Sequence, residues 1–169
     1  DTVVTRVGEN AYRAVFSVAS LGSVVAMCVG YGATSNIFLW VPPIALQHAA
    51  MLPMLLAALL VVLGLGTPSP TAVAGERLLD TADPATGILR ITRHPFLWGV
   101  TIWAVTHIIV NGDAASLLYF GTFAVVAVLG TASIDAKRQR TCGAAWDAFA
   151  AVTSSIPFGA ILQRRNTLY

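Results

Sequence analysis

Four stretches of this chain carry no charged residue and approach the about 20 residues that a helix needs to cross a bilayer. They are Ala14–Ala33, Ile44–Gly66 (with Pro53 as a predicted kink), Pro95–Val110 and Ala114–Ile134. None alternates polar and apolar residues as a porin strand does. Only 11% of the 169 residues are charged, against about 25% in a soluble domain. The sequence therefore predicts an all-α membrane protein, a polytopic helical bundle of about four spans, forming one domain over residues 1–169 in the lipid bilayer.

The basic residues are all predicted to lie on one side of the membrane. With four spans, the ten lysines and arginines fall at the two chain ends and in the Thr67–Arg93 loop, while the loops Thr34–Pro43 and Asn111–Asp113 carry none. This distribution follows the positive-inside rule. We therefore expect a bacterial inner membrane or an organelle inner membrane, with both termini on the cytoplasmic, matrix or stromal side. Because the chain does not start with Met, we expect a trimmed product or the loss of an earlier helix.

The chain after the fourth span is expected to lie at the membrane surface, as an interfacial segment over residues 140–162. Arg140–Phe149 would form an interfacial helix with Trp146 and Phe149 at the level of the lipid headgroups. Ser154–Leu162 is apolar and would return towards the membrane.

Two histidines lie inside predicted spans, where polar side chains are costly and therefore candidates for function. His48 lies about one turn into the second span and His107 about one turn before the end of the third, so both are expected near the outer surface. If these helices pack together, the two imidazoles would approach each other in the arrangement that holds a b-type haem. Alternatively, each imidazole hydrogen-bonds a backbone carbonyl or water. The spacing leaves both interpretations open.

A second candidate site lies at the other end of the third span. Arg93 and His94 precede Pro95, which is typical of the first position of a helix. Arg93 and the free N–H groups at the helix start would bind an anion such as a lipid phosphate or a haem propionate. Alternatively, Arg93 anchors the helix at the headgroups. His94 lies about 20 Å from His107 along a helix, so the two cannot bind one iron from a single straight helix.

The remaining polar and aromatic residues carry weaker signals. Asn111–Asp113 contains the Asn-Gly pair of a tight turn. Trp98 and Trp103 either line a flat apolar ligand, such as a porphyrin or a polyene, or make ordinary lipid and helix contacts. Cys28 and Cys142 form no disulfide or zinc motif. The net charge of +2 does not indicate nucleic acid as a partner.

Three runs of the chain are similar to the NnrU family, which includes the plastid 15-cis-zeta-carotene isomerase. They are Arg6–Gly32, Arg93–Gly121 (RHPFLWGVTIWAVTHIIVNGDAASLLYFG) and Ser154–Leu162. The resemblance implies a multi-pass membrane protein. Bacterial members are associated with denitrification and nitric oxide metabolism, and the carotenoid member uses haem b to isomerise a cis double bond.

The same resemblance implies a role for one histidine. His107, in the WAxxH position, corresponds to a haem ligand, whereas the resemblance secures no ligand role for His94. Family members usually start with a further helix carrying a His-Ser pair, where we expect the second ligand. This chain starts after that point, so a cleaved helix, His48 or another subunit would supply it.

The run Gly87–Gly99 (GILRITRHPFLWG), followed by CGAAWDAF and SIPF, is also similar to the membrane isoprenylcysteine methyltransferases. In that interpretation Arg93 and His94 help hold S-adenosylmethionine. The chain departs from that pattern around Phe96, and Ile134–Arg140 lacks its paired glutamates. Three interpretations remain: a haem-binding NnrU-type protein with a redox or polyene cis–trans isomerase role, a non-catalytic accessory subunit of a larger membrane complex, and an S-adenosylmethionine-dependent methyltransferase.

Overall fold

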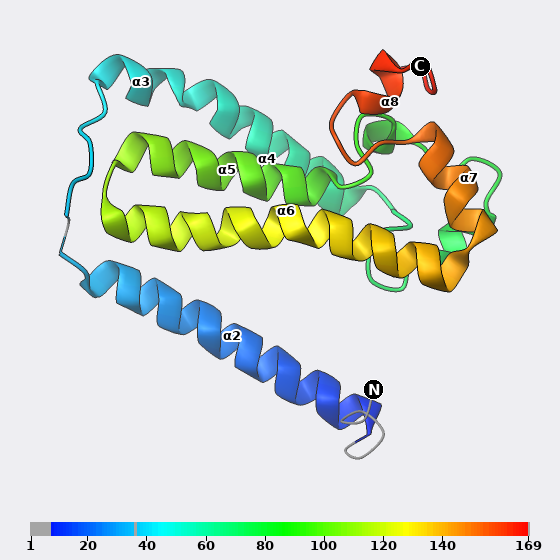
Figure 1. Cartoon of the computed structure of the whole chain (residues 1–169), viewed down its shortest axis with the longest axis horizontal. Helices are drawn as coiled ribbons and strands as arrows, with labels where there is room; N and C mark the ends of the chain where they lie inside the picture. Colours follow the sequence, from blue (N-terminus) through cyan, green and yellow to red (C-terminus); the bar gives the residue numbers. More distant parts are fainter. Residues whose placement is uncertain (1–7, 36, 169) are drawn as a thin grey trace.

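A computed structural model describes residues 8–35 and 37–168 of the chain and folds them mainly into helices (Figure 1). The elements, in chain order, are α2 (Glu9–Ala33), α3 (Ile44–Ala49), α4 (Met51–Gly66), the short 3-10 turns η1 (Glu76–Asp80) and η2 (Gly87–Arg90), α5 (Pro95–Asn111), α6 (Ala114–Cys142), α7 (Ala144–Val152) and α8 (Gly159–Leu162). The predicted all-α architecture is confirmed.

Three helical stretches are long and apolar enough to cross a membrane. They are Asn10–Ala33, Ile44–Gly66 and Ala114–Cys142, and α5 is a shorter apolar helix of 17 residues. A helix of that length rises about 26 Å, slightly less than the hydrocarbon thickness of about 30 Å. The predicted kink in the second stretch is found as a break at Ala50 between α3 and α4. Pro53 has no N–H to donate to the carbonyl of Ala49, which weakens the helix at this turn.

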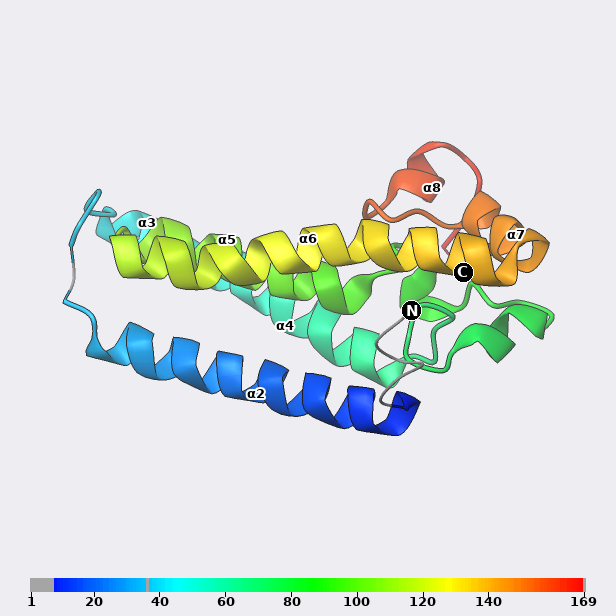
Figure 2. The same ribbon diagram turned by 60° about the horizontal axis from the view of Figure 1, so that its bottom comes forward.

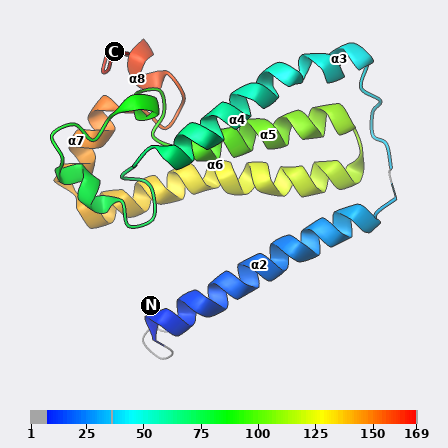
Figure 3. The same ribbon diagram turned by 180° about the vertical axis from the view of Figure 1, so that it is seen from behind.

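The helices α4, α5 and α6 form the packed part of the bundle, with α5 between its two antiparallel neighbours (Figures 1 and 3). Gly99 of α5 makes the close approach to α4 feasible. A Cβ at this position would lie 2.7 Å from Val61 Cγ2 and 2.8 Å from the carbonyl oxygen of Ala57. The two backbones therefore meet where a side chain is missing, as is common between membrane helices.

The helix α2 runs beside α6 and diverges from it towards its own N-terminal end (Figures 1 and 3). Among its described side chains only Met27 and Tyr31 are partly buried, and the rest are exposed. An apolar helix with so little protein cover would expose a large hydrophobic surface to water. Lipid around α2 removes this cost, because its backbone groups are satisfied within the helix.

The described basic residues gather at one end of the bundle, which we call the basic end. They lie at the start of α2, in the loop after α4, in the last turns of α6 and in the C-terminal segment: Arg13, Arg77, Arg90, Arg93, Lys137, Arg138, Arg140, Arg164 and Arg165. Arg6 lies outside the described residues. The opposite end, which we call the turn end, holds the Asn111–Asp113 turn, where Gly112 adopts φ 72°. The loop before α3 is tied to this turn, because the N–H groups of Leu39 and Trp40 donate to the Gly112 carbonyl at 2.7 and 3.0 Å.

At the basic end, the structure differs in three details from what the sequence predicted for the chain after the fourth span. The helix α6 continues past Ile134 to Cys142, and the next helix covers Ala144–Val152 rather than Arg140–Phe149. Trp146 and Phe149 do not face the lipid headgroups, because they are 2% and 1% exposed within the protein. They pack with Leu79 and Ala85 of the loop between α4 and α5, and together these residues form a small separate hydrophobic core. Burial against this loop removes the two rings from water without any contribution from lipid.

Candidate functional site

His107 lies in the last turns of α5, on the side that faces α6. Its Nδ1 is 2.8 Å from the carbonyl oxygen of Trp103, one turn earlier. Because a carbonyl oxygen can only accept, Nδ1 carries the hydrogen, and Nε2 of the neutral ring keeps its lone pair. A backbone carbonyl on one ring nitrogen is the usual way to orient a metal-binding histidine. The hydrogen bond that we gave as the alternative to a ligand role is thus present, and it is compatible with that role.

An aromatic cluster surrounds the imidazole. The ring of His107 stacks on Phe120 of α6 with a centroid distance of 4.5 Å, and the ring of Trp103 packs edge-on against Phe120 at 5.1 Å. Phe120 in turn contacts Tyr31 of α2 at 5.8 Å, and Tyr31 stacks on Tyr119 at 4.7 Å. One phenylalanine therefore separates His107 from the contact between α2 and α6.

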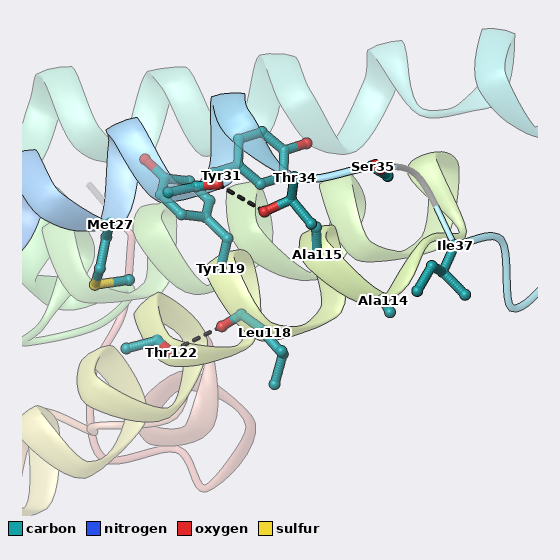
Figure 4. A pocket seen from close by; sticks show the side chains of 11 residues that line it. Met27, Tyr31, Thr34, Ser35, Ile37, Ala114, Ala115, Leu118, Tyr119 and Thr122 are labelled. Atoms are coloured by element: carbon teal, nitrogen blue, oxygen red, sulfur yellow. Dashed lines mark hydrogen bonds between the residues drawn. The ribbon is translucent and has the colours of Figure 1, made fainter.

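A groove opens between α2 and α6 beside this cluster, at the turn end (Figure 4). Its volume is about 480 Å³. Met27 and Tyr31 of α2 line it together with Leu118 and Tyr119 of α6, where Tyr31 stacks on Tyr119. Thr122 adds a hydroxyl group. No side chain that lines the groove is charged. A groove that is mostly apolar with a few hydroxyl groups fits a flat, hydrophobic molecule better than a polar metabolite.

Hydrogen bonds close the turn end next to the groove. The carboxylate of Asp113, the N-cap of α6, accepts from the Ser116 N–H at 2.8 Å and from the Ser116 hydroxyl at 2.6 Å. The Ser116 oxygen also lies 2.9 Å from the Tyr31 hydroxyl and 3.1 Å from Asn111 Nδ2. The bonds from Ser116 lower the pKa of the Asp113 carboxyl, although burial acts in the opposite direction. The network therefore holds an ionised carboxylate and fixes the tyrosine that lines the groove.

The structure does not bring His48 to His107. His48 lies on α3, which stands apart from α5 before α4 approaches it (Figure 1). The His48 side chain is exposed. His107 is directed to the other side of α5, against Phe120. Among the described residues there is no group of three or more His, Cys, Asp or Glu side chains that would hold a metal ion. Of the two histidines, only His107 is therefore close to the groove.

Arg93 and His94 meet Asp135 at the basic end. His94 is the N-cap of α5, with Pro95 following as predicted, and its Nε2 is 2.7 Å from Asp135 Oδ1. The Arg93 guanidinium reaches Asp135 Oδ2 through Nε at 3.0 Å and Nη2 at 2.9 Å. Its plane also lies over the ring of Trp146, 5.6 Å from the centroid. Because both side chains are engaged with one carboxylate, an anion or S-adenosylmethionine bound here would have to share Arg93 with Asp135.

The C-terminal segment is attached to the same region. The backbone N–H of Arg93 donates to the Ser154 carbonyl at 2.9 Å, and the Ser155 carbonyl accepts from the Thr92 hydroxyl and from Trp98 Nε1, both at 2.7 Å. Trp98 thus binds the backbone of the segment that we expected to return towards the membrane. Helix α5 begins inside a scaffold formed by the chain end and the end of α6.

Sequence reasoning missed two parts of this arrangement. Asp135 received no role, although it is the first charge after the uncharged stretch that ends at Ile134. A carboxylate placed at the end of a span, opposite a conspicuous Arg-His pair, was the available signal. The contacts of Tyr31 and Ser116 gave no such signal, because they are 85 residues apart.

Taken together, these features define a class: a helical membrane protein with a backbone-oriented histidine near an apolar groove lined by aromatic residues. The family of NnrU proteins matches residues 1–167, and the chain belongs to this family. The chain is also 31% identical over 83 residues to the chloroplastic 15-cis-zeta-carotene isomerase of Zea mays. That alignment covers 49% of this chain and 23% of the maize protein, so the chain matches less than a quarter of that relative's length. No solved structure matches the chain.

Proposed function

We propose that this NnrU-family protein binds haem b through His107 and has a redox-dependent role, with cis–trans isomerisation of an apolar polyene as the reaction. The observation that carries the proposal is the orientation of His107, whose Nδ1 is held by the Trp103 carbonyl at 2.8 Å. This leaves Nε2 as the coordinating atom. The similarity to a protein named as a carotene isomerase supports the substrate class.

The residues present fit a haem held through His107. His107 is preoriented, and Phe120 and Trp103 provide flat apolar surfaces of the kind that pack against a porphyrin. A second ligand, if haem is bound, would not be His48, since His107 packs against Phe120 of α6 and His48 is exposed on α3. When bound, haem would supply a redox-active iron that exchanges electron density with a ligand nearby.

The protein's own residues would bind and orient the substrate. The groove that Tyr31 and Tyr119 help to line is open at the surface of the bundle, so a polyene would enter it from the membrane without passing through water. The stacked rings of Tyr31 and Tyr119 would offer an apolar aromatic surface to a conjugated chain. The network of Asp113 and Ser116 holds Tyr31 in place. In this proposal the chain provides positioning and an apolar environment, and no acid or base in the groove takes part.

We also propose that the basic end faces the cytoplasm, the matrix or the stroma. The described basic residues lie at that end, and the loop Ile37–Pro43 and the Asn111–Asp113 turn carry no lysine or arginine. The groove and His107 would then lie in the outer half of the bilayer.

The absorption spectrum of the purified chain, reconstituted with haem in detergent, tests the cofactor. A Soret band with resolved bands in the reduced state is expected for the wild type and for His48→Ala, which removes an exposed histidine on α3. His107→Ala is expected to lose these bands. A wild type that stays colourless, or a His107→Ala variant with an unchanged spectrum, would refute haem binding through His107.

A second candidate function is a non-catalytic subunit of a larger membrane complex. The observation that favours it is the exposed surface of α2, whose partly buried side chains among the described residues are Met27 and Tyr31. Stoichiometric co-purification with another membrane protein, in a preparation that binds no haem, would support this function over the first. Purification as a single chain that binds haem would exclude it.

A further inference from the structure

A second groove lies at the basic end, far from the histidine. The start of α2, residues 71–76 of the loop after α4 and the last turns of α6 enclose it, because α2 diverges from α6 here (Figure 2). Its volume is about 770 Å³. The site proposed above does not use it.

The charges that line this groove are mainly positive. Arg13, Lys137 and Arg138 face it, together with one carboxylate, that of Glu76. Glu76 forms an ion pair with Arg138 Nη1, and its side chain is 45% exposed. The Lys137 side chain is exposed, and its ammonium group makes no hydrogen bond or ion pair with the residues that the structure describes. On α6 alone, Lys137 and Arg138 outnumber the one carboxylate that lines the groove.

Arg138 provides an independent indication of a ligand. Its side chain is 6% exposed, and Nη2 donates to the carbonyl of Ala72 at 2.6 Å. Its Nε is buried and has no acceptor among the described residues. A buried N–H group of a charged side chain is destabilising when it has no acceptor. An oxygen atom from a bound anion would remove this cost, once the half-exposed Glu76 side chain moves aside.

The rest of the lining is apolar. Phe16 and Tyr12 of α2, Val73 of the loop and Ile134 of α6 form the walls. Ile134 is the last residue before the charged end of α6, so the groove joins the headgroup level to the hydrocarbon level. A free phosphate would use only the basic part of such a groove. A molecule with a phosphate group and an acyl chain would use all of it.

We propose that this groove binds an anionic phospholipid of the leaflet at the basic end. Its phosphate oxygens accept from Arg138 Nε and from the Lys137 ammonium, and its acyl chain lies along Phe16 and Ile134. Basic residues next to membrane helices recognise anionic headgroups in this way. The lipid also fills the space between α2 and α6 where protein contacts are missing, and so holds α2 against the bundle.

The test is a lipid titration of the full chain in detergent, followed by native mass spectrometry. Phosphatidylglycerol is the probe and phosphatidylcholine the neutral comparison. Lys137→Gln is expected to weaken phosphatidylglycerol binding about fivefold, the effect of one basic residue near an anionic surface. The matched control is Arg140→Gln, an exposed residue one turn later on α6 that does not line the groove.

Each outcome decides the proposal. Equal loss in the two variants, or equal binding of both lipids by the wild type, would overturn it. If inorganic phosphate at the lipid concentration displaces phosphatidylglycerol, the site takes free phosphate and the lipid assignment is wrong. Arg138→Lys keeps the charge and removes Nε, so weaker binding is expected here as well. If Arg138→Lys does not fold, Lys137→Gln still decides. Haem binding plays no part in this readout, so the two proposals can fail independently.

Discussion

The ion cluster at the basic end predicts that Asp135→Asn strongly destabilises the fold. The Arg93 and His94 side chains are 14% and 1% exposed, and that of Asp135 is 22% exposed. Removing one partner of a buried ion pair costs about 3–5 kcal/mol, because the other charge stays behind unpaired. Since Asp135 keeps some contact with solvent, we expect the lower limit, about 3 kcal/mol. For a chain of this size that lowers the midpoint of thermal unfolding by about 6–12 °C.

The measurement is thermal unfolding of the full chain in detergent, followed by circular dichroism and by tryptophan fluorescence. Trp146 lies over Arg93, so its emission reports on the same cluster. Asp147→Asn is the matched control, because Asp147 is an exposed carboxylate on α7 that only accepts from Gln139. Its expected effect is below about 1 kcal/mol.

A double variant identifies the cause of the destabilisation. If the unpaired charge of Arg93 is responsible, adding Arg93→Met to Asp135→Asn will recover part of the lost stability. If the effects of the two substitutions simply add, the loss comes from packing. An Asp135→Asn variant that unfolds at the same temperature as Asp147→Asn would refute the reasoning altogether.

Two further predictions concern the bundle and its turn end. Gly99→Ala is expected to lower stability by about 1–3 kcal/mol, because the added Cβ would clash with Val61 of α4. As a control in the same thermal assay, Gly121→Ala should be neutral or slightly stabilising, because no atom lies within 4 Å of its added Cβ. Asp113→Ala is expected to cost about 1–2 kcal/mol near neutral pH through the lost helix cap. The bonds from Ser116 lower the pKa of Asp113 in the folded protein. Its stabilising effect is therefore present above the ordinary carboxyl pKa of about 3.9 and is lost as the pH falls through the lower folded value. A difference in stability between Asp113→Ala and wild type that persists unchanged in strong acid would contradict this.

Several features of the fold were predictable because they depend on local sequence. Hydropathy along the chain predicted the apolar helices, Pro95 the start of α5, and the Asn-Gly pair the turn that ends at Asp113. The ends of helices near the charged segments were less predictable. Helix α6 continues past Ile134, because Asp135 and Arg138 find partners in the loop and remain helical beyond the apolar stretch.

The candidate site shows the same division. Sequence alone determined that His107 lies in an apolar helix near one end, and that the Arg93–His94 pair lies at the other. It could not determine which neighbour each side chain faces, because that depends on the rotation of α5 between α4 and α6. The tertiary structure turned His107 towards Phe120 and away from His48, and it turned Arg93 towards Asp135. The physical reason is that a helix's own residues decide whether it is stable in lipid or in water. Which residues it contacts depends on close packing with segments that are distant in the chain.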